Sequence, residues 1–441
     1  MFERKPRSSH EAALLDTVAR YLPGGVRTPT MSPTHAMVVA SAAGARIRDC
    51  SGNEYIDYLL GSGPMLLGHA HPTVVAAIRD WLDKGSTYLV VNEPAIRLAE
   101  EIVRAVPCAE KVSFNSTGSE STFFALRLAR AFRKRRKILK FEGAYHGMSD
   151  YALMSTHWNR AVRDYPAPVP DSAGIPPCIE GEVLIAPFND IETTTAMVEL
   201  HHDELAGVIV EPMQRTIPPL PGFLEALRAV TQHYEIPLIF DEIVTGFRLA
   251  YGGAQAYYGV VPDLCALGKS MSGGLPLSVL CGRADIMDHI DPARLATGDH
   301  VRQTGTFSGN ALAAVAALAT LEELRRPGAY ARLFDAGRRL MDALRTLLAD
   351  ARIPAQVLGE PPAFEVWFSD HRITDFRSSL RADTARRDRF VELLLDRGIV
   401  KAHEKFFLSL AHTDEDLDIT TDAFAGAIDS LSRITRGRGR G

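Results

Sequence analysis

The sequence of 441 residues has little cysteine, no long apolar run and only a small excess of one charge. The cysteines are five in number, scattered, and without a C-x-x-C spacing, which argues against a disulfide framework or a zinc site and fits a reducing cytoplasm. They are Cys50, Cys108, Cys178, Cys265 and Cys281. No apolar run approaches the roughly 20 residues of a membrane span, and residues 1–10 lack the apolar core of a signal peptide.

A net charge of −5 gives no bulk electrostatic reason to expect nucleic-acid binding. What remains is an ordinary globular composition, 46% hydrophobic and 23% charged, on a chain long enough for about two or three domains. We expect a globular protein of the cytoplasm.

Short apolar runs alternate with amphipathic segments through the middle of the chain, which predicts a parallel, doubly wound sheet. The expected strands are 111–114, 138–141, 206–210, 236–240 and 264–267. We therefore expect an α/β fold with a large domain at 66–306. A helix and a small antiparallel sheet are expected at 1–65, and an α+β domain at 307–441. His69 and His71 flank a Gly/Pro-rich turn and fit hydrogen bonding there better than metal binding.

Two residues stand at the ends of neighbouring expected strands. Asp241 closes one apolar run, and Lys269 follows the next, between Gly268 and the pair Gly273-Gly274. In an open parallel sheet, ligands bind beyond the carboxyl ends of the strands. A lysine on a glycine-lined loop can form a Schiff base with an aldehyde, and an aspartate can keep a pyridine nitrogen protonated. Each residue alone fits a structural role better than a catalytic one, so the functional interpretation of the pair depends on its surroundings.

Other strand ends carry polar or aromatic residues that fit the same site. The segment 115–120 is a small polar loop before a helix, a place where backbone N–H groups suit a phosphate, although Ser and Thr are also ordinary helix caps there. Tyr145 lies on a loop between Gly143 and Gly147, where its ring can lie against a planar group. Glu211 ends another strand, and 301–310 is a second loop of this kind.

Taken together, these motifs resemble the class III, fold type I aminotransferases that depend on pyridoxal 5′-phosphate (PLP). The nearest resemblance is to the glutamate-1-semialdehyde aminomutase-like branch. It rests on Leu22–Val26, Asp49–Tyr58, Gly68–Pro72 and Gly305–Asn310.

The resemblance implies roles around the cofactor ring. Lys269 forms the Schiff base and moves the substrate proton, and Asp241 binds the pyridine nitrogen. Tyr145 and Ile243 lie on opposite ring faces, and Glu211 lies near the phenolic edge.

The resemblance also implies how the cofactor phosphate is bound. Gly118 and Ser119 bind it, helped by Thr117. Thr306 completes the phosphate site from the neighbouring subunit, so a homodimer with shared active sites is expected.

The residues expected to contact substrate depart from this branch. Its carboxylate-binding arginine aligns with Met31 here, although Arg27 lies nearby. Ser62 stands in a loop where an aromatic residue is expected. Glu404 replaces an arginine of related β-amino-acid transaminases and would attract an ammonium group, unless it is only a solvated loop charge. Arg27, Ser62 and Glu404 are therefore the candidate substrate residues.

These departures favour amino transfer to a non-carboxylate aldehyde or ketone, such as an oxo-sugar of the aminoglycoside type in antibiotic biosynthesis, or a polyamine aldehyde. The alternatives are a glutamate-1-semialdehyde-type aminomutase, a β-amino acid transaminase and an epimerase. A non-catalytic regulatory protein is disfavoured because Lys269, Asp241 and Tyr145 are all present.

Overall fold

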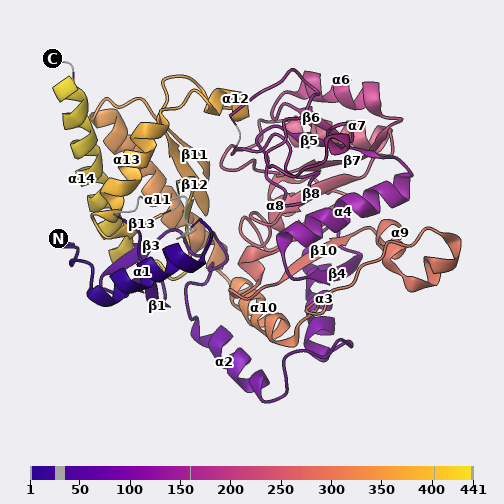
Figure 1. Ribbon diagram of the computed structural model, residues 1–441, viewed down its shortest axis with the longest axis horizontal. Helices are drawn as coiled ribbons and strands as arrows, with labels where there is room; N and C mark the ends of the chain where they lie inside the picture. The colour runs from indigo at the N-terminus through magenta and orange to yellow at the C-terminus, as the bar shows by residue number, and fades with distance from the viewer. Residues whose placement is uncertain (1, 25–34, 159, 402, 439–441) are drawn as a thin grey trace. The chain divides into compact units, whose positions relative to one another are not determined.

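A computed structural model describes residues 2–24, 35–158, 160–401 and 403–438 (Figure 1). It divides into two compact units. The terminal unit comprises Met1–Pro72, Pro327–Arg372 and Arg381–Gly441, and the sheet unit comprises Thr73–Arg326 and Ile373–Leu380.

The sheet unit is built on seven strands in the order β4-β10-β9-β8-β7-β5-β6 (Figure 1). Their bounds are β4 (Lys111–Asn115), β5 (Lys137–Phe141), β6 (Val183–Ala186), β7 (Leu205–Val210), β8 (Leu238–Glu242), β9 (Leu264–Leu267) and β10 (Ser278–Gly282). β9, β8, β7, β5 and β6 pair in parallel, whereas β10 runs antiparallel to both β9 and β4. The predicted α/β fold with a mainly parallel sheet is confirmed.

The sheet unit also contains helices, some of which connect these strands while others precede β4 or follow β10. They are α2 (Pro72–Leu82), α3 (Glu93–Ala105), α4 (Gly118–Arg133), α5 (Pro177–Glu180), α6 (Ile191–His201), α7 (Phe223–His233), α8 (Gly253–Tyr258), α9 (Ala284–Met287), α10 (Ala311–Leu324) and α12 (Phe376–Ser379). Short 3-10 turns are η1 (Lys269–Met271), η2 (Asp288–Ile290) and η3 (Pro292–Thr297). The sheet unit extends past the predicted domain end at 306 because α10 packs against α3 within it.

Helix α4 shows how local sequence places a helix start at the sheet edge. Thr117 caps its N-terminus in a capping box with Glu120, and Lys134 ends it in a left-handed conformation. Its buried face packs over β7, β9 and β10. That face includes Ala125, Leu126, Leu128 and Ala129, which meet Ile138, Ile209, Ile239 and Leu280 of the strands. Burying this apolar stripe fixes the helix start beyond β4.

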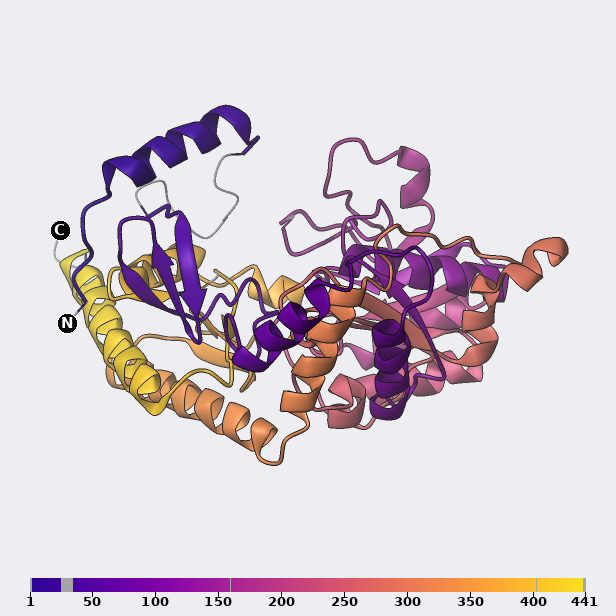
Figure 2. The same ribbon diagram turned by 90° about the horizontal axis from the view of Figure 1, so that it is seen from below.

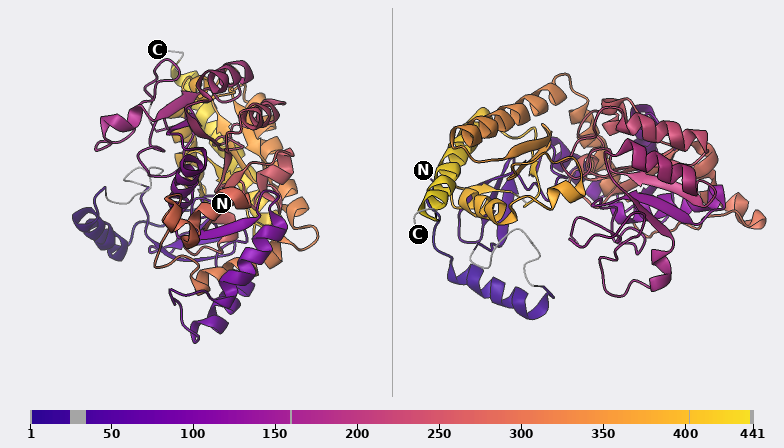
Figure 3. Two further views of the ribbon diagram at one scale, coloured as in Figure 1. Left: turned by 90° about the vertical axis from the view of Figure 1, so that its right-hand side faces the viewer. Right: turned by 90° about the horizontal axis from the view of Figure 1, so that it is seen from above.

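The terminal unit contains two small sheets, ordered β1-β2-β3-β13 and β11-β12-β14. Its strands are β1 (Val39–Ala43), β2 (Arg46–Asp49), β3 (Glu54–Asp57), β11 (Gln356–Glu360), β12 (Ala363–Trp367), β13 (Ile399–Val400) and β14 (Phe406–Phe407). Its helices are α1 (Ser9–Tyr21), α11 (Ala329–Asp350), α13 (Thr384–Leu395) and α14 (Asp414–Arg438). The long helices α11 and α14 lie side by side (Figure 2 and Figure 3).

His69 lies in a hydrogen-bonded turn of the terminal unit. His69 Nε2 lies 2.8 Å from Asp57 Oδ2, and the His69 backbone pairs with Gly44, as expected for histidine in a hydrogen-bonded turn. Among the described helices, none has both the length and the apolarity needed to cross a membrane.

Candidate active site

Four strands of the sheet unit end where the predicted cofactor residues lie. Asp241 is the penultimate residue of β8, and Lys269 comes two residues after β9 ends. Glu211 directly follows β7, and Tyr145 follows β5 by four residues. These strands are parallel, so their carboxyl ends meet at one edge of the sheet.

The Asp241 carboxylate is buried and held by two N–H groups. Its side chain is on a residue only 6% exposed. Oδ2 lies 2.8 Å from Nδ1 of His146, and Oδ1 accepts from the backbone N–H of Ile243 at 3.1 Å. A carboxylate is only an acceptor, so the His146 proton belongs on Nδ1. His146 directly follows Tyr145 in the chain, but its role could not be predicted from its position in the sequence.

His146 is itself fixed by its surroundings. It is 1% exposed, and its carbonyl accepts from the Thr122 hydroxyl at 2.6 Å, which ties the loop to α4. Its Nε2 has no hydrogen-bond partner within the described part of the chain. The ring is therefore positioned mainly through its contact with Asp241.

Glu211 joins two loops through one carboxylate. Oε1 accepts from the backbone N–H of Tyr145 at 2.8 Å, and Oε2 accepts from that of Arg215 at 3.1 Å. Arg215 has φ 59, in the left-handed region that non-glycine residues seldom adopt. Arg215 was also not identified from the sequence. The carboxylate of Glu211 thus sets the distance between the Tyr145 loop and the Arg215 turn.

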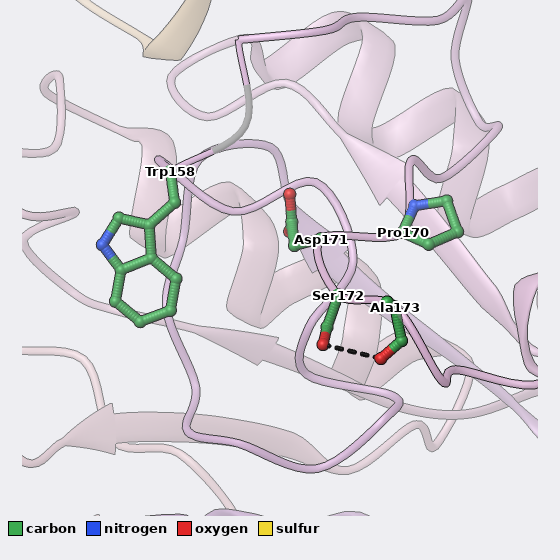
Figure 4. Close-up of a pocket in the computed structure, with 5 residues that line it drawn as sticks. All are labelled: Trp158, Pro170, Asp171, Ser172 and Ala173. Carbon is green, nitrogen blue, oxygen red and sulfur yellow. Dashed lines mark hydrogen bonds between the residues drawn. The ribbon is translucent and has the colours of Figure 1, made fainter. Parts of the chain in front are cut away.

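The ring of Tyr145 packs against other rings. Its centroid lies 4.9 Å from that of Trp158, with the planes tilted by 58°, and 6.1 Å from that of His157. Burial raises the pKa of Tyr145. Trp158 also lines a surface hollow of about 440 Å³ together with residues 170–173 (Figure 4). Trp158 therefore contacts both the Tyr145 ring and this surface hollow.

The start of α4 presents the predicted anion-binding segment. The Thr117 hydroxyl accepts from Glu120 N at 3.3 Å, so it serves as the helix cap. The Ser119 hydroxyl accepts from Met148 N at 3.2 Å. The first N–H groups of the helix, those of Gly118 and Ser119, need no intrahelical acceptor and lie at the positive end of the helix dipole.

Ile243 packs where two glycines leave room for it. A Cβ on Gly118 would lie 2.9 Å from Ile243 Cδ1, and a Cβ on Gly268 would lie 3.2 Å from the same atom. Because neither glycine has a Cβ, the start of α4, the end of β8 and the Lys269 loop can pack closely together. Ile243 therefore forms an apolar surface between the anion-binding segment and the lysine.

Lys269 lies in a strained and electrostatically unusual position. Its φ is 39, just after the extended Gly268, and the residue is partly buried. Burial, helped by the positive charges of Arg215 and Arg248, lowers the pKa of its amine to about 8, although Asp241 and Glu211 oppose this shift. A much larger share of neutral amine is therefore present near neutral pH than for an ordinary lysine.

The remaining predicted residues lie elsewhere in the chain. Thr306 is exposed in the turn before α10. Ser62 and Glu404 belong to the terminal unit, Ser62 in an exposed turn with φ 70 and Glu404 between β13 and β14. Arg27 lies outside the described residues. Their functional roles stay predictions.

Three cysteines that are far apart in the sequence meet in the core of the sheet unit. The sulfurs of Cys108, Cys265 and Cys281 all lie within 4.8 Å of one another. Cys281 faces Cys265 across the β9–β10 pair, and its thiol donates to the Cys265 carbonyl at 3.6 Å. Spacing along the sequence does not reveal this cluster, because it arises from the pairing of β9 with β10 and from the position of the segment before β4.

The contact between Gly147 and Ser119 gives a test of how tightly these loops are packed. Gly147 has φ 92, and a Cβ there would lie 2.6 Å from Ser119 Cα. Gly174 has nearly the same backbone, φ 90, but open space around it. We expect Gly174→Ala to cost about 1–2 kcal/mol in the free energy of unfolding, and Gly147→Ala at least about 1–3 kcal/mol more, because backbone must move.

Urea unfolding of both variants would measure this difference. Equal destabilisation by the two substitutions would show that the Gly147 loop is not packed against the start of α4.

Comparison with known proteins identifies the family. The model of the aminotransferase class-III family matches residues 28–428. The chain is 40% identical over 422 residues to the glutamate-1-semialdehyde 2,1-aminomutase of Desulforudis audaxviator, covering 93% of this chain and 96% of that protein.

Solved structures agree with this assignment. An omega-transaminase from Sphaerobacter thermophilus is 33% identical with a TM-score of 0.90, covering 97% of this chain and 99% of its own. A transaminase with PLP bound is 27% identical with a TM-score of 0.89, covering 98% and 100%. The expected fold type and the expected PLP-dependent enzyme class are confirmed, and the chain belongs to the class-III aminotransferase family.

Proposed function

We propose that this enzyme uses PLP to move an amino group on a carboxylate-bearing amino acid, with the isomerisation of glutamate-1-semialdehyde as its leading reaction. The observation that carries this proposal is the meeting of a low-pKa lysine, a buried Asp–His pair and a helix start at one sheet edge. In the leading reaction an amino group moves from carbon 2 to carbon 1 of one molecule, so no second substrate is consumed.

The residues present fit PLP. Its phosphate matches the N–H groups of Gly118 and Ser119, and a side chain on Gly118 would fill the space beside Ile243. Ile243 and Tyr145 provide an apolar and an aromatic surface for the two faces of a flat ring. When bound, PLP supplies an aldehyde carbon for amines and a ring that withdraws electrons.

Asp241 would bind the ring nitrogen, and His146 would keep Asp241 in place. A carboxylate beside a pyridine nitrogen favours its protonated form. The Nδ1–H of His146 and the N–H of Ile243 occupy one lone pair on each oxygen and leave the others for the ring. Because both partners are buried, the carboxylate needs little rearrangement when the ring binds.

Lys269 would move the proton at the substrate carbon. Its lowered pKa allows the neutral amine to accept that proton near neutral pH and to return it at a neighbouring carbon. Glu211 would lie near the phenolic edge of the ring, at the distance set by its contacts with the Tyr145 loop and the Arg215 turn.

The proposal includes a homodimer. Thr306 stands exposed in a polar turn, a position from which it could reach a phosphate held by another subunit. Thr117 would contribute to the phosphate site mainly as the cap that fixes the helix start.

The relatives change the expected substrate. They favour the aminomutase alternative over an oxo-sugar acceptor. Transfer between two molecules, as in an ω- or β-amino acid transaminase, is the second candidate, and the similarity to the Sphaerobacter omega-transaminase over nearly the whole chain supports it. Glutamate-1-semialdehyde and ω- or β-amino acids all carry a carboxylate as well as an amine.

Substrate requirements would separate the two candidates. We expect the purified holoenzyme to isomerise glutamate-1-semialdehyde without an amino acceptor, because donor and acceptor carbons belong to one molecule. Product formation would be followed by chromatography, with Lys269→Ala as the inactive control. If β-phenylalanine reacts only when a keto acid is added, and the semialdehyde does not react, the second candidate replaces the first.

The pH dependence of the Lys269 amine provides an independent test. Only the neutral amine is a nucleophile, so acetylation of Lys269 in the cofactor-free protein should increase with pH around a midpoint of about 8. An added lysine peptide, with an ordinary value of about 10.4, serves as internal reference. Labelling would be measured by mass spectrometry, and identical profiles for both amines would contradict the proposed role of burial and nearby cations.

The role of His146 can be tested by two substitutions. His146→Leu removes the donor to Asp241, and we expect kcat to fall about 10- to 100-fold, the worth of a charge-assisted hydrogen bond of roughly 1.5–3 kcal/mol. His146→Asn keeps an N–H near the Nδ1 position and should retain most of the activity. The pH titration of the cofactor absorbance should shift in the leucine variant alone; equal losses in both variants would instead indicate a packing role.

A further inference from the structure

Arg215 occupies the tip of a tight turn that starts just beyond β7. Ile217 N donates to Gln214 O at 2.8 Å, and the two residues form an antiparallel bridge. This places Arg215 second in the turn, with φ 59. A left-handed backbone costs an ordinary residue roughly 1–2 kcal/mol, and glycine would avoid that cost. The strained position therefore suggests that the arginine side chain itself is used.

The turn is fixed at both ends. The buried side chain of Gln214 donates to Glu142 O at 2.7 Å. The backbone N–H of Arg215 donates to Glu211, whose other oxygen accepts from Tyr145. The Glu211 carboxylate thus links the backbone of Arg215 to that of Tyr145. The backbone position of Arg215 is therefore fixed relative to the proposed ring site.

Among the described residues, Arg215 and Arg248 both lower the pKa of Lys269, and they differ in their exposure to solvent. Arg248 is 0% exposed, and its Nε donates to Val244 O at 2.9 Å, so a solute cannot reach it. Arg215 is partly exposed. Its charge is felt by Lys269 and also by Tyr145, where it opposes the effect of burial on the pKa. Of these two described arginines, Arg215 is therefore the one that a solute can reach.

We infer that the guanidinium of Arg215 binds the carboxylate of the substrate and makes the enzyme selective for amino acids over the corresponding amines, an inference that rests on the proposed function. A guanidinium can donate two parallel N–H bonds to one carboxylate, which fixes orientation as well as position. The binding cation would thus come from the loop after β7 and not from Arg27 near the N-terminus.

The test compares acids with amines that lack only the carboxylate. Suitable pairs are 4-aminobutanoate with propylamine and β-phenylalanine with 1-phenylethylamine. For the holoenzyme, dissociation constants are measured from the cofactor absorbance, and kcat/KM is measured wherever a pair is turned over. The variants are Arg215→Gln, Arg215→Lys and, as a charge-matched control, Arg135→Gln, which alters an exposed residue just after α4.

We expect wild type and Arg135→Gln to bind each acid more tightly than its amine. Arg215→Gln should weaken acid binding about 10- to 100-fold, as expected for a lost charged hydrogen bond, and reduce the acid-to-amine preference accordingly. Arg215→Lys should fall between, because it keeps the charge without the paired donors.

The inference is overturned if Arg215→Gln weakens acid and amine equally, since that indicates a general effect on folding or on Lys269. It is also overturned if wild type shows no preference for the acids. Failure of the proposed function would be a separate result, in which no substrate undergoes amino transfer. The preference of wild type for acids, and its loss in Arg215→Gln, could still be measured as dissociation constants in that case.

Discussion

The parallel register of β7, β8 and β9 is the constraint on which the site depends. Val210 lies opposite Phe240, and Glu242 opposite Leu267, so the three strands end nearly level. Side chains alternate between the two faces of a strand, and a shift of one residue would turn Asp241 to the opposite face. Because these strands are buried on both sides, only their ends can carry polar groups without a large desolvation cost.

Successive side chains of a strand point to opposite faces, so the neighbouring carboxylates of Asp241 and Glu242 on β8 have different roles. Asp241 faces His146 at the sheet edge. Glu242, 0% exposed, faces the other way and accepts from the backbone N–H groups of Ala254 and Gln255. Burial raises the pKa of Glu242 to about 7 in spite of those donors. Glu242 therefore anchors the start of α8. Its hydrogen bonds to α8 also fix the end of β8, which carries Asp241.

Much of the site could be predicted from the sequence because its signals are local. Apolar runs marked the strands, and the residues after them, such as Asp241, Glu211 and Lys269, were expected at one edge for that reason alone. The helix start at Thr117 was equally visible as a small polar loop before an amphipathic segment.

Other features depend on contacts between distant segments. His146 binds a residue 95 positions away, and the three core cysteines meet only in the folded chain, through the pairing of β9 with β10 and the position of the segment before β4. Nothing in the sequence distinguishes Arg215 from the other arginines. Its positive φ and its hydrogen bond to Glu211 are visible only in the structure. The antiparallel direction of β10 likewise arises from its pairing with β4 and β9, for which its own residues carry no local signal.

The electrostatics of the site link substrate binding to proton transfer. Arg215 helps to lower the pKa of Lys269 and is also the accessible cation to which a substrate carboxylate would bind. An anion at Arg215 would cancel part of that positive field, and the pKa of Lys269 would then rise. The neutral share of the amine would thus be larger before substrate binds, when the amine must react as a nucleophile, and the amine would be more basic once substrate is in place. Arg248, being buried, would keep its share of the field constant throughout. A single charged turn after β7 can in this way coordinate recognition of the substrate with the basicity of the lysine.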